Sequence, residues 1–147
     1  MKAGILLLVL LFAAFPLWAG QEEPQSFVGL TLEQLIARLG VPQTVFVSRG
    51  AELWQDDVVF QYPLGNFYIH RNRVWQVSLR QVTVRDAQGI RLGDTRSAVL
   101  LALGEDVNDL GRHVVYRLPS ALWPMALRVN FNEAGVVTAI FIYRSDY

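Results

Sequence analysis

The sequence predicts an α+β fold with two tandem helix–β–β–β repeats, whose short helices pack on one face of an antiparallel sheet. The segment GLTLEQLIARLG (29–40) is echoed by GDTRSAVLLALG (93–104). Runs of alternating apolar residues, typical of strands, follow each copy. A short helix with a three-stranded meander buries too little apolar surface to be stable alone. We therefore expect the two copies, residues 27–84 and 89–143, to share one core within a single domain, 27–147.

The beginning of the chain has the pattern of an export signal. Lys2 precedes the apolar run GILLLVLLFAAF, Pro16 interrupts it, and Ala19 stands before the predicted cleavage point. The run is shorter than the ~20 residues of a membrane-spanning helix. We predict a signal peptide over 1–19, with an uncleaved anchor as the alternative, and a flexible polar lead-in over 20–26.

The two echoed segments carry helix start and stop signals. Leu32, Leu35, Ile36 and Leu39 form one apolar stripe. Before them, Thr31 is an N-cap residue with a glutamine three positions later, which predicts a capping box. In the second copy Thr95 caps the helix, and Gly40 and Gly104 supply the stops at positive φ.

Strands are predicted wherever apolar residues alternate between turn signals. They cover 43–48, 57–63, 66–70 and 73–84 in the first half, and 113–119, 125–131 and 136–143 in the second. In the strand from Arg73 we expect Trp75, Val77 and Leu79 to face the helices, and Val74, Gln76, Ser78 and Arg80 to face outward. The repeat match places Val137, Ala139, Phe141 and Tyr143 on the outward face.

Composition excludes several classes of function. The chain has no cysteine, which excludes a disulfide scaffold and a lipid anchor on cysteine. Lys2 is the only lysine, so 13 basic residues minus one leaves 12 arginines against 13 acidic residues. This near balance argues against nucleic acid as a partner. Without another lysine, neither a Schiff base nor a P-loop can form.

The chain resembles the SmpA/OmlA family in its repeated pattern G-x-T-x-x-x-[LV]-[LI]-x-x-L-G, which is followed by a strand with an aromatic residue and by a hairpin. That family includes a small lipoprotein subunit of the outer-membrane β-barrel assembly machine. The tandem form resembles the β-lactamase-inhibitor-protein fold. The resemblance implies a helix-backed sheet whose other face binds a protein or a cell-wall component. This chain departs from the assembly-machine members, which have one unit and a lipidation cysteine.

The outward sheet face holds most of the candidate binding residues. Arginine, amide and aromatic side chains, which protein interfaces favour, are expected there together; they are Arg80, Arg128, Asn130, Phe141 and Tyr143. An ordinary solvated face is the alternative. Two loop tryptophans complete the candidates. Trp123 lies between two prolines and Trp54 lies in an acidic loop, and each is read either as a binding anchor or as a structural plug.

Metal and catalytic sites are not expected. His70 and His113 lack a ligand partner at zinc spacing, and the acidic residues Glu52, Asp56 and Asp57 lack the spacing of a calcium loop. No nucleophile elbow is present. We therefore expect neither a cofactor nor an enzyme.

The sequence indicates an exported, non-enzymatic protein-binding module of the bacterial cell envelope, periplasmic or secreted. Its partner would be another envelope or secreted protein, without nucleic acid, without a lipid anchor, and with membrane contact only if the signal is uncleaved. One alternative is an inhibitor of a secreted or periplasmic enzyme such as a β-lactamase. A second is a small-ligand-binding or enzymatic domain with a pocket near a histidine and a buried carboxylate.

Overall fold

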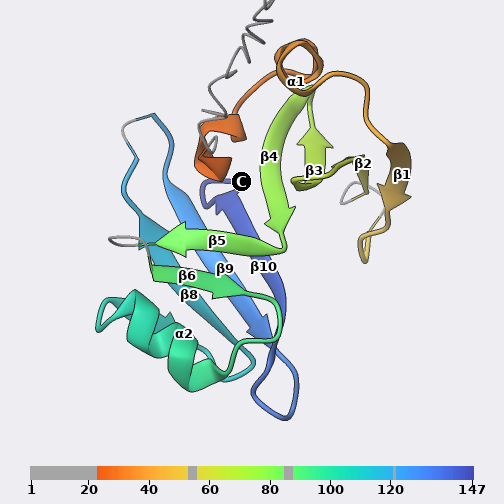
Figure 1. Ribbon diagram of the computed structural model, residues 1–147. Helices are drawn as coiled ribbons and strands as arrows, with labels where there is room; N and C mark the ends of the chain where they lie inside the picture. Colours follow the sequence, from red (N-terminus) through yellow and green to blue (C-terminus); the bar gives the residue numbers. More distant parts are fainter. Residues whose placement is uncertain (1–22, 53–55, 85–87, 121) are drawn as a thin grey trace, which may run out of the picture.

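The computed structural model describes residues 23–52, 56–84, 88–120 and 122–147. Over these residues the fold is an eight-stranded antiparallel sheet with a smaller two-stranded sheet and two short α-helices (Figure 1). The order of the large sheet is β1-β2-β3-β4-β10-β9-β8-β7. The predicted signal peptide lies outside the described residues. Within the described part, no helix is both long and apolar enough to cross a bilayer.

The first half of the chain contains one 3-10 helix, one α-helix and four strands: η1 (Pro24–Phe27), α1 (Leu32–Leu39), β1 (Thr44–Ser48), β2 (Asp57–Tyr62), β3 (Gly65–His70) and β4 (Arg73–Leu79). A hairpin follows, made of β5 (Gln81–Val84) and β6 (Gln88–Arg91). The second half contains one helix and four strands: α2 (Arg96–Leu103), β7 (Val107–Asp109), β8 (His113–Leu118), β9 (Met125–Phe131) and β10 (Val137–Arg144).

The helix boundaries are those that the sequence predicts. Thr31 accepts from the backbone of Gln34, whose side chain accepts from the backbone of Thr31, so the capping box is confirmed. Thr95 caps α2 through the backbone N–H of Ala98. Gly40 and Gly104 end the helices at φ values of 78° and 76°. Local signals determine these ends because a cap needs only residues within one turn.

One apolar core lies between the large sheet and a covering layer. The inward side chains of the central strands, such as Phe67, Leu127 and Ile140, are fully buried in it. The covering layer contributes residues from η1, α1, β5, β6 and α2: Phe27, Leu35, Val82, Ile90 and Leu103. In Figure 1 the β5–β6 hairpin crosses over β9 and β10, with α2 below it. The other face of the large sheet has no such layer among the described residues and is called the open face below.

The predicted fold class is wrong. The structure is mostly sheet, and its halves are not helix–β–β–β units. The predicted strand 73–84 breaks at Arg80 into β4 and β5, which belong to different sheets. The short strands β6 and β7 were not predicted at all. The reason is physical: a strand of three or four residues carries too few alternations to stand out, and a break between sheets requires no proline or glycine.

Two β-bulges alter which side chains face the core. The β3–β4 register shifts between Tyr68 and Ile69, so that Trp75 is the extra residue and Val74 is fully buried in the core. The β9–β10 register shifts between Val137 and Ala139, and Val137 also joins the core. The predictions that Trp75 faces the helices and that Val74 and Val137 face outward are therefore wrong. An inserted residue reverses the alternation on one side of the bulge.

Candidate functional site

The open face is built by residues that pair across six strands. Beginning at β2, the register aligns Gln61, Asn66, Ser78, Phe141, Arg128 and Val115 in one transverse row. A second row aligns Tyr68, Gln76, Tyr143 and Ala126. Neighbouring strands lie about 4.8 Å apart, so side chains within a row touch or nearly touch. Long-range pairing thus brings residues from both halves together on one surface.

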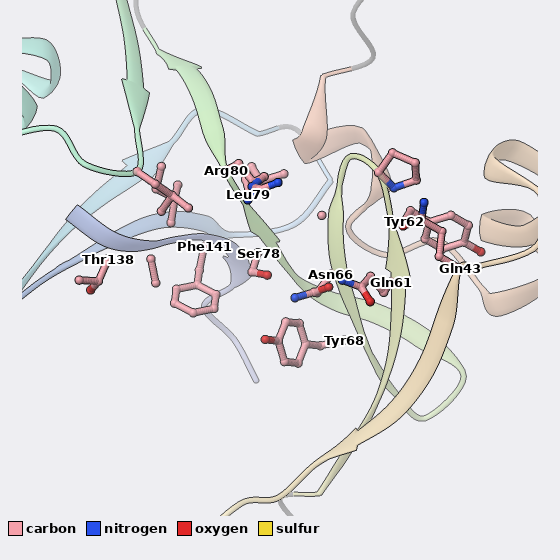
Figure 2. A pocket seen from close by; sticks show the side chains of 15 residues that line it. Gln43, Gln61, Tyr62, Asn66, Tyr68, Ser78, Leu79, Arg80, Thr138 and Phe141 are labelled. Carbon is pink, nitrogen blue, oxygen red and sulfur yellow. The ribbon is translucent and has the colours of Figure 1, made fainter.

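A groove of about 430 Å³ lies at the end of this surface where β4 stops (Figure 2). Its lining is mostly uncharged, with amide, hydroxyl and aromatic side chains; these include Gln61, Asn66, Tyr68, Ser78, Thr138 and Phe141. Arg80 is its charged lining residue. The Tyr68 and Phe141 rings meet edge to face, with their centroids 6.5 Å apart. The groove therefore offers π-faces and hydrogen-bonding groups close together, without a carboxylate.

Arg128 lies against aromatic rings beside the groove. Its guanidinium carbon lies 4.7 Å from the centroid of Phe141 and 5.9 Å from that of Tyr143. The Arg128 Nε atom is buried and has no hydrogen-bond partner among the described residues. The same holds for Asn130 Oδ1, two positions along β9. Cation–π contact orients the guanidinium while leaving its hydrogen-bond donors unused by the chain.

The structure brings five of the seven predicted site residues to one surface. Four of them lie on β9 and β10 of the open face: Arg128, Asn130, Phe141 and Tyr143. Arg80 lines the groove where β4 gives way to β5 and is exposed. Tyr68 and Asn66 belong to the same surface but were not predicted. In NFYIH they alternate with the buried Phe67, so the period-2 pattern contained the signal.

Trp123 lies elsewhere. It is half-buried, packs against the core, and its ring lies 3.9 Å from the guanidinium carbon of Arg144. A Cβ on Gly29 would approach Trp123 Nε1 to 2.5 Å, which shows how closely the backbone passes. This packing is that of a plug at the end of the sheet. Trp54 lies outside the described residues.

A polar and aromatic cluster lies at the opposite end of the open face from the groove. Trp75 Nε1 donates to Asp57 Oδ1 at 3.1 Å. The ring of Tyr147 lies 5.6 Å from that of His70 and 6.2 Å from that of Trp75. Burial raises the pKa of Asp57, and the Trp75 hydrogen bond and the nearby His70 oppose this rise. Asp57 is thus a buried carboxyl that the chain itself satisfies through Trp75.

The histidines are far apart in the sheet. His70 is on β3 and His113 on β8, with β4, β10 and β9 between them, and neither lines the groove. In the part of the chain that the structure describes, no group of three or more histidine, aspartate or glutamate side chains is arranged to hold a metal ion.

Comparisons with known proteins place the fold. No protein-family model and no curated protein sequence matches the chain. An extracellular protein containing an SCP domain from Bacillus anthracis has a similar structure, with a TM-score of 0.51 and 14% identity. A cysteine-rich secretory protein from Staphylococcus aureus matches with a TM-score of 0.45 and 13% identity. Each match covers 86% of this chain, which spans about half (47%) of the matched chain.

These findings overturn the resemblance to the SmpA/OmlA family and to the β-lactamase-inhibitor-protein fold. The structure with the higher TM-score, 0.51, is instead a protein that contains an SCP domain. The helix motif misled because a capped two-turn amphipathic helix with a glycine stop occurs in many folds. At 14% identity, the Bacillus anthracis protein shows a likeness of fold alone.

Proposed function

We propose that this chain is an exported, non-enzymatic module that binds another envelope or secreted protein through its open face. The single observation that carries this proposal is the composition of that face. Half-buried aromatic rings, amides and a stacked arginine line it, and the opposite face is covered by helices and a hairpin. Tyrosine, phenylalanine and arginine are enriched at protein interfaces, whereas acidic residues are depleted there.

Preorganisation supports a binding role. Arg128 and the Tyr68–Phe141 pair are held by packing on a β-sheet rather than on loops. Binding to such a surface costs little side-chain entropy, because the rotamers are already restricted. A groove beside these rings provides a recess for a partner side chain.

The alternatives receive less support. The inhibitor alternative depended on the resemblance that the comparisons overturn. For the enzymatic alternative, the groove contains Ser78 but neither a histidine nor a carboxylate among its lining residues. A serine nucleophile needs a base within hydrogen-bond reach. Export is proposed from the signal pattern, and the similar Bacillus anthracis protein is itself extracellular.

Site-specific photocrosslinking in intact cells tests the proposal. A photoreactive phenylalanine analogue replaces Tyr68 or Phe141 on the open face, and in a control strain it replaces Leu101, which is 81% exposed on α2. We expect the open-face positions to capture one discrete protein that mass spectrometry identifies, and the α2 position to capture none. Capture from Leu101 alone, or no capture from either open-face position, would contradict the proposal.

A further inference from the structure

We propose that the open face recognises an acidic, extended polypeptide segment, with Arg128 as the main carboxylate-binding residue. This inference rests on the proposed function and adds the chemistry of the partner. Three features of the described residues support it: the outward positions of the relevant strands carry no carboxylate, Arg80, Arg117 and Arg128 form no ion pair, and aromatic and amide side chains lie between them.

The outward positions from β3 to β7 carry no carboxylate. In strand order they are Asn66, Tyr68 and His70; Arg73, Trp75, Gln76 and Ser78; Ala139, Phe141 and Tyr143; Ala126, Arg128 and Asn130; His113, Val115 and Arg117; and Asn108. Arg80 follows at the end of β4. The nearest acidic side chain on this face is Asp57 on β2, which is bound to Trp75. Arg73 donates to the carbonyl oxygen of Gly29. The other arginines of this surface, Arg80, Arg117 and Arg128, give it a positive potential on a chain with no net charge.

Three arginines outside the open face form ion pairs with carboxylates of the chain. Arg49 pairs with Asp56, Arg96 with Asp109, and Arg144 with Asp146. Arg80, Arg117 and Arg128 form no ion pair with any residue that the structure describes, and unlike Arg91 and Arg112 they lie together on the open face. The guanidinium groups of these three arginines therefore remain available to a carboxylate from outside the chain.

Arg128 is the best placed of the three. It is half-buried, and removing a guanidinium from water without a carboxylate partner is costly. The cation–π contacts with Phe141 and Tyr143 offset only part of this cost and restrict the position of the guanidinium. A carboxylate can accept two parallel N–H groups from a guanidinium whose position is restricted in this way. Arg117 lies diagonally across from Arg128 on β8, about 7–8 Å away, which is near enough for a second carboxylate.

The charge density of the surface favours a protein segment over other polyanions. Anionic membranes select clusters of about four to eight basic residues, and nucleic acids require many phosphate contacts. Here three arginines are spread among rings and amides, a spacing that matches carboxylates interleaved with neutral side chains. In an extended segment alternate side chains point to one side, so acidic residues at every second position would face the sheet together.

Fluorescence anisotropy with a defined probe tests the inference. The probe is a fluorescein-labelled peptide of alternating threonine and glutamate, and its matched control has glutamine in place of glutamate. We expect wild type to bind the acidic peptide about tenfold or more tightly than the neutral one. Arg128→Gln should remove most of this preference, and added salt should weaken only the binding of the acidic peptide. Arg80→Gln and Arg117→Gln should each produce a smaller loss.

Arg91→Gln is the matched control, because it removes the same charge from β6 in the layer that covers the opposite face. It should leave the affinity within about twofold of wild type, since an interaction with a remote exposed charge is screened. Unfolding curves establish that each variant is folded. If Arg128→Gln and Arg91→Gln have equal effects, or if both peptides bind equally, the inference is wrong.

Two further probes separate the partner classes. The probes are heparin fragments and phosphatidylglycerol vesicles. The assignment to a protein segment is wrong if either probe binds wild type more tightly than the acidic peptide does and loses this binding in Arg128→Gln. The photocrosslinks separate this inference from the proposed function. If the captured protein contacts the open face through a neutral or basic segment, the proposed function stands and the acidic preference fails.

Discussion

Gly65→Ala should destabilise the chain far more than an ordinary glycine substitution. A Cβ at this position would lie 2.0 Å from the Ser78 carbonyl oxygen and 3.2 Å from its carbon. Gly65 pairs with Leu79 on β4, and β4 is locked between β3 and β10, so this oxygen cannot move without disturbing the ladder. Losing one ladder hydrogen bond costs about 1 kcal/mol, and a buried carbonyl left unpaired costs about 1–3 kcal/mol more.

The expected total loss is therefore about 2–4 kcal/mol in the free energy of unfolding. Urea denaturation followed by tryptophan fluorescence measures this loss as a lower midpoint at unchanged slope. Gly89→Ala is the control, because it also lies in a strand but the nearest atom to its added Cβ is 3.8 Å away. That variant should stay within about 0.5 kcal/mol of wild type or gain slightly. Equal midpoints for the two variants would refute the packing argument at Gly65.

Three further predictions concern stability. Gly40→Val and Gly104→Val should each cost about 1–3 kcal/mol, because a β-branched residue is strained at their positive φ; thermal melts matching wild type would contradict this. Trp123→Ala should lower stability by about 2–4 kcal/mol without changing partner affinity, since its ring packs on the core; weakened binding with unchanged stability would reverse that assignment. Burial raises the pKa of Asp57 in the folded state above the ordinary value of 3.8, so protonation of this carboxyl favours folding. The free energy of unfolding of wild type should therefore increase relative to that of Asp57→Asn as the pH falls from the raised pKa to 3.8. Urea midpoints measured across this window should diverge with acidification, and parallel profiles would show that Asp57 is not perturbed.

Local signals predicted the helices well. The capping box at Thr31, the cap at Thr95 and the two glycine stops all lie where the sequence places them, because each depends on contacts within one helical turn. The two helices also begin alike, since Thr31 bridges to Arg73 and Thr95 bridges to Val136. The likeness between the two halves is confined to these helices and their first contacts and does not extend to a repeat of three strands after each helix.

Sheet faces were predicted less well because alternation fails at bulges. Ser78, Phe141 and Arg128 share one row as the period-2 pattern implies. Trp75 does not follow it, because it is the inserted residue of a bulge and bonds to Asp57, which lies 18 positions earlier in the chain. No residue type marks this insertion in the sequence. Non-local pairing fixes it, and so the register could be known only from the folded sheet.

The candidate site was only partly predictable for the same reason. Arg128 and Phe141 are cross-strand neighbours, and the hairpin turn between β9 and β10 brings them together. Tyr68 reaches Phe141 only because β4 pairs with β10 and joins the two halves of the chain. The groove at Arg80 forms where β4 ends and β5 begins in the other sheet, and the alternation in the sequence predicts a single continuous strand across this point.

The central claim is that the open face is the binding surface. The most direct test is to measure the affinity of the crosslinked partner for two variants, one on the open face and one on the covering layer. Phe141→Ser removes the ring that supports Arg128, and Leu101→Ser removes an exposed apolar side chain from the covering layer. With both proteins folded, we predict that Phe141→Ser raises Kd about tenfold or more, whereas Leu101→Ser leaves it within about twofold. Unchanged Kd for Phe141→Ser, or a larger effect of Leu101→Ser, would contradict the account.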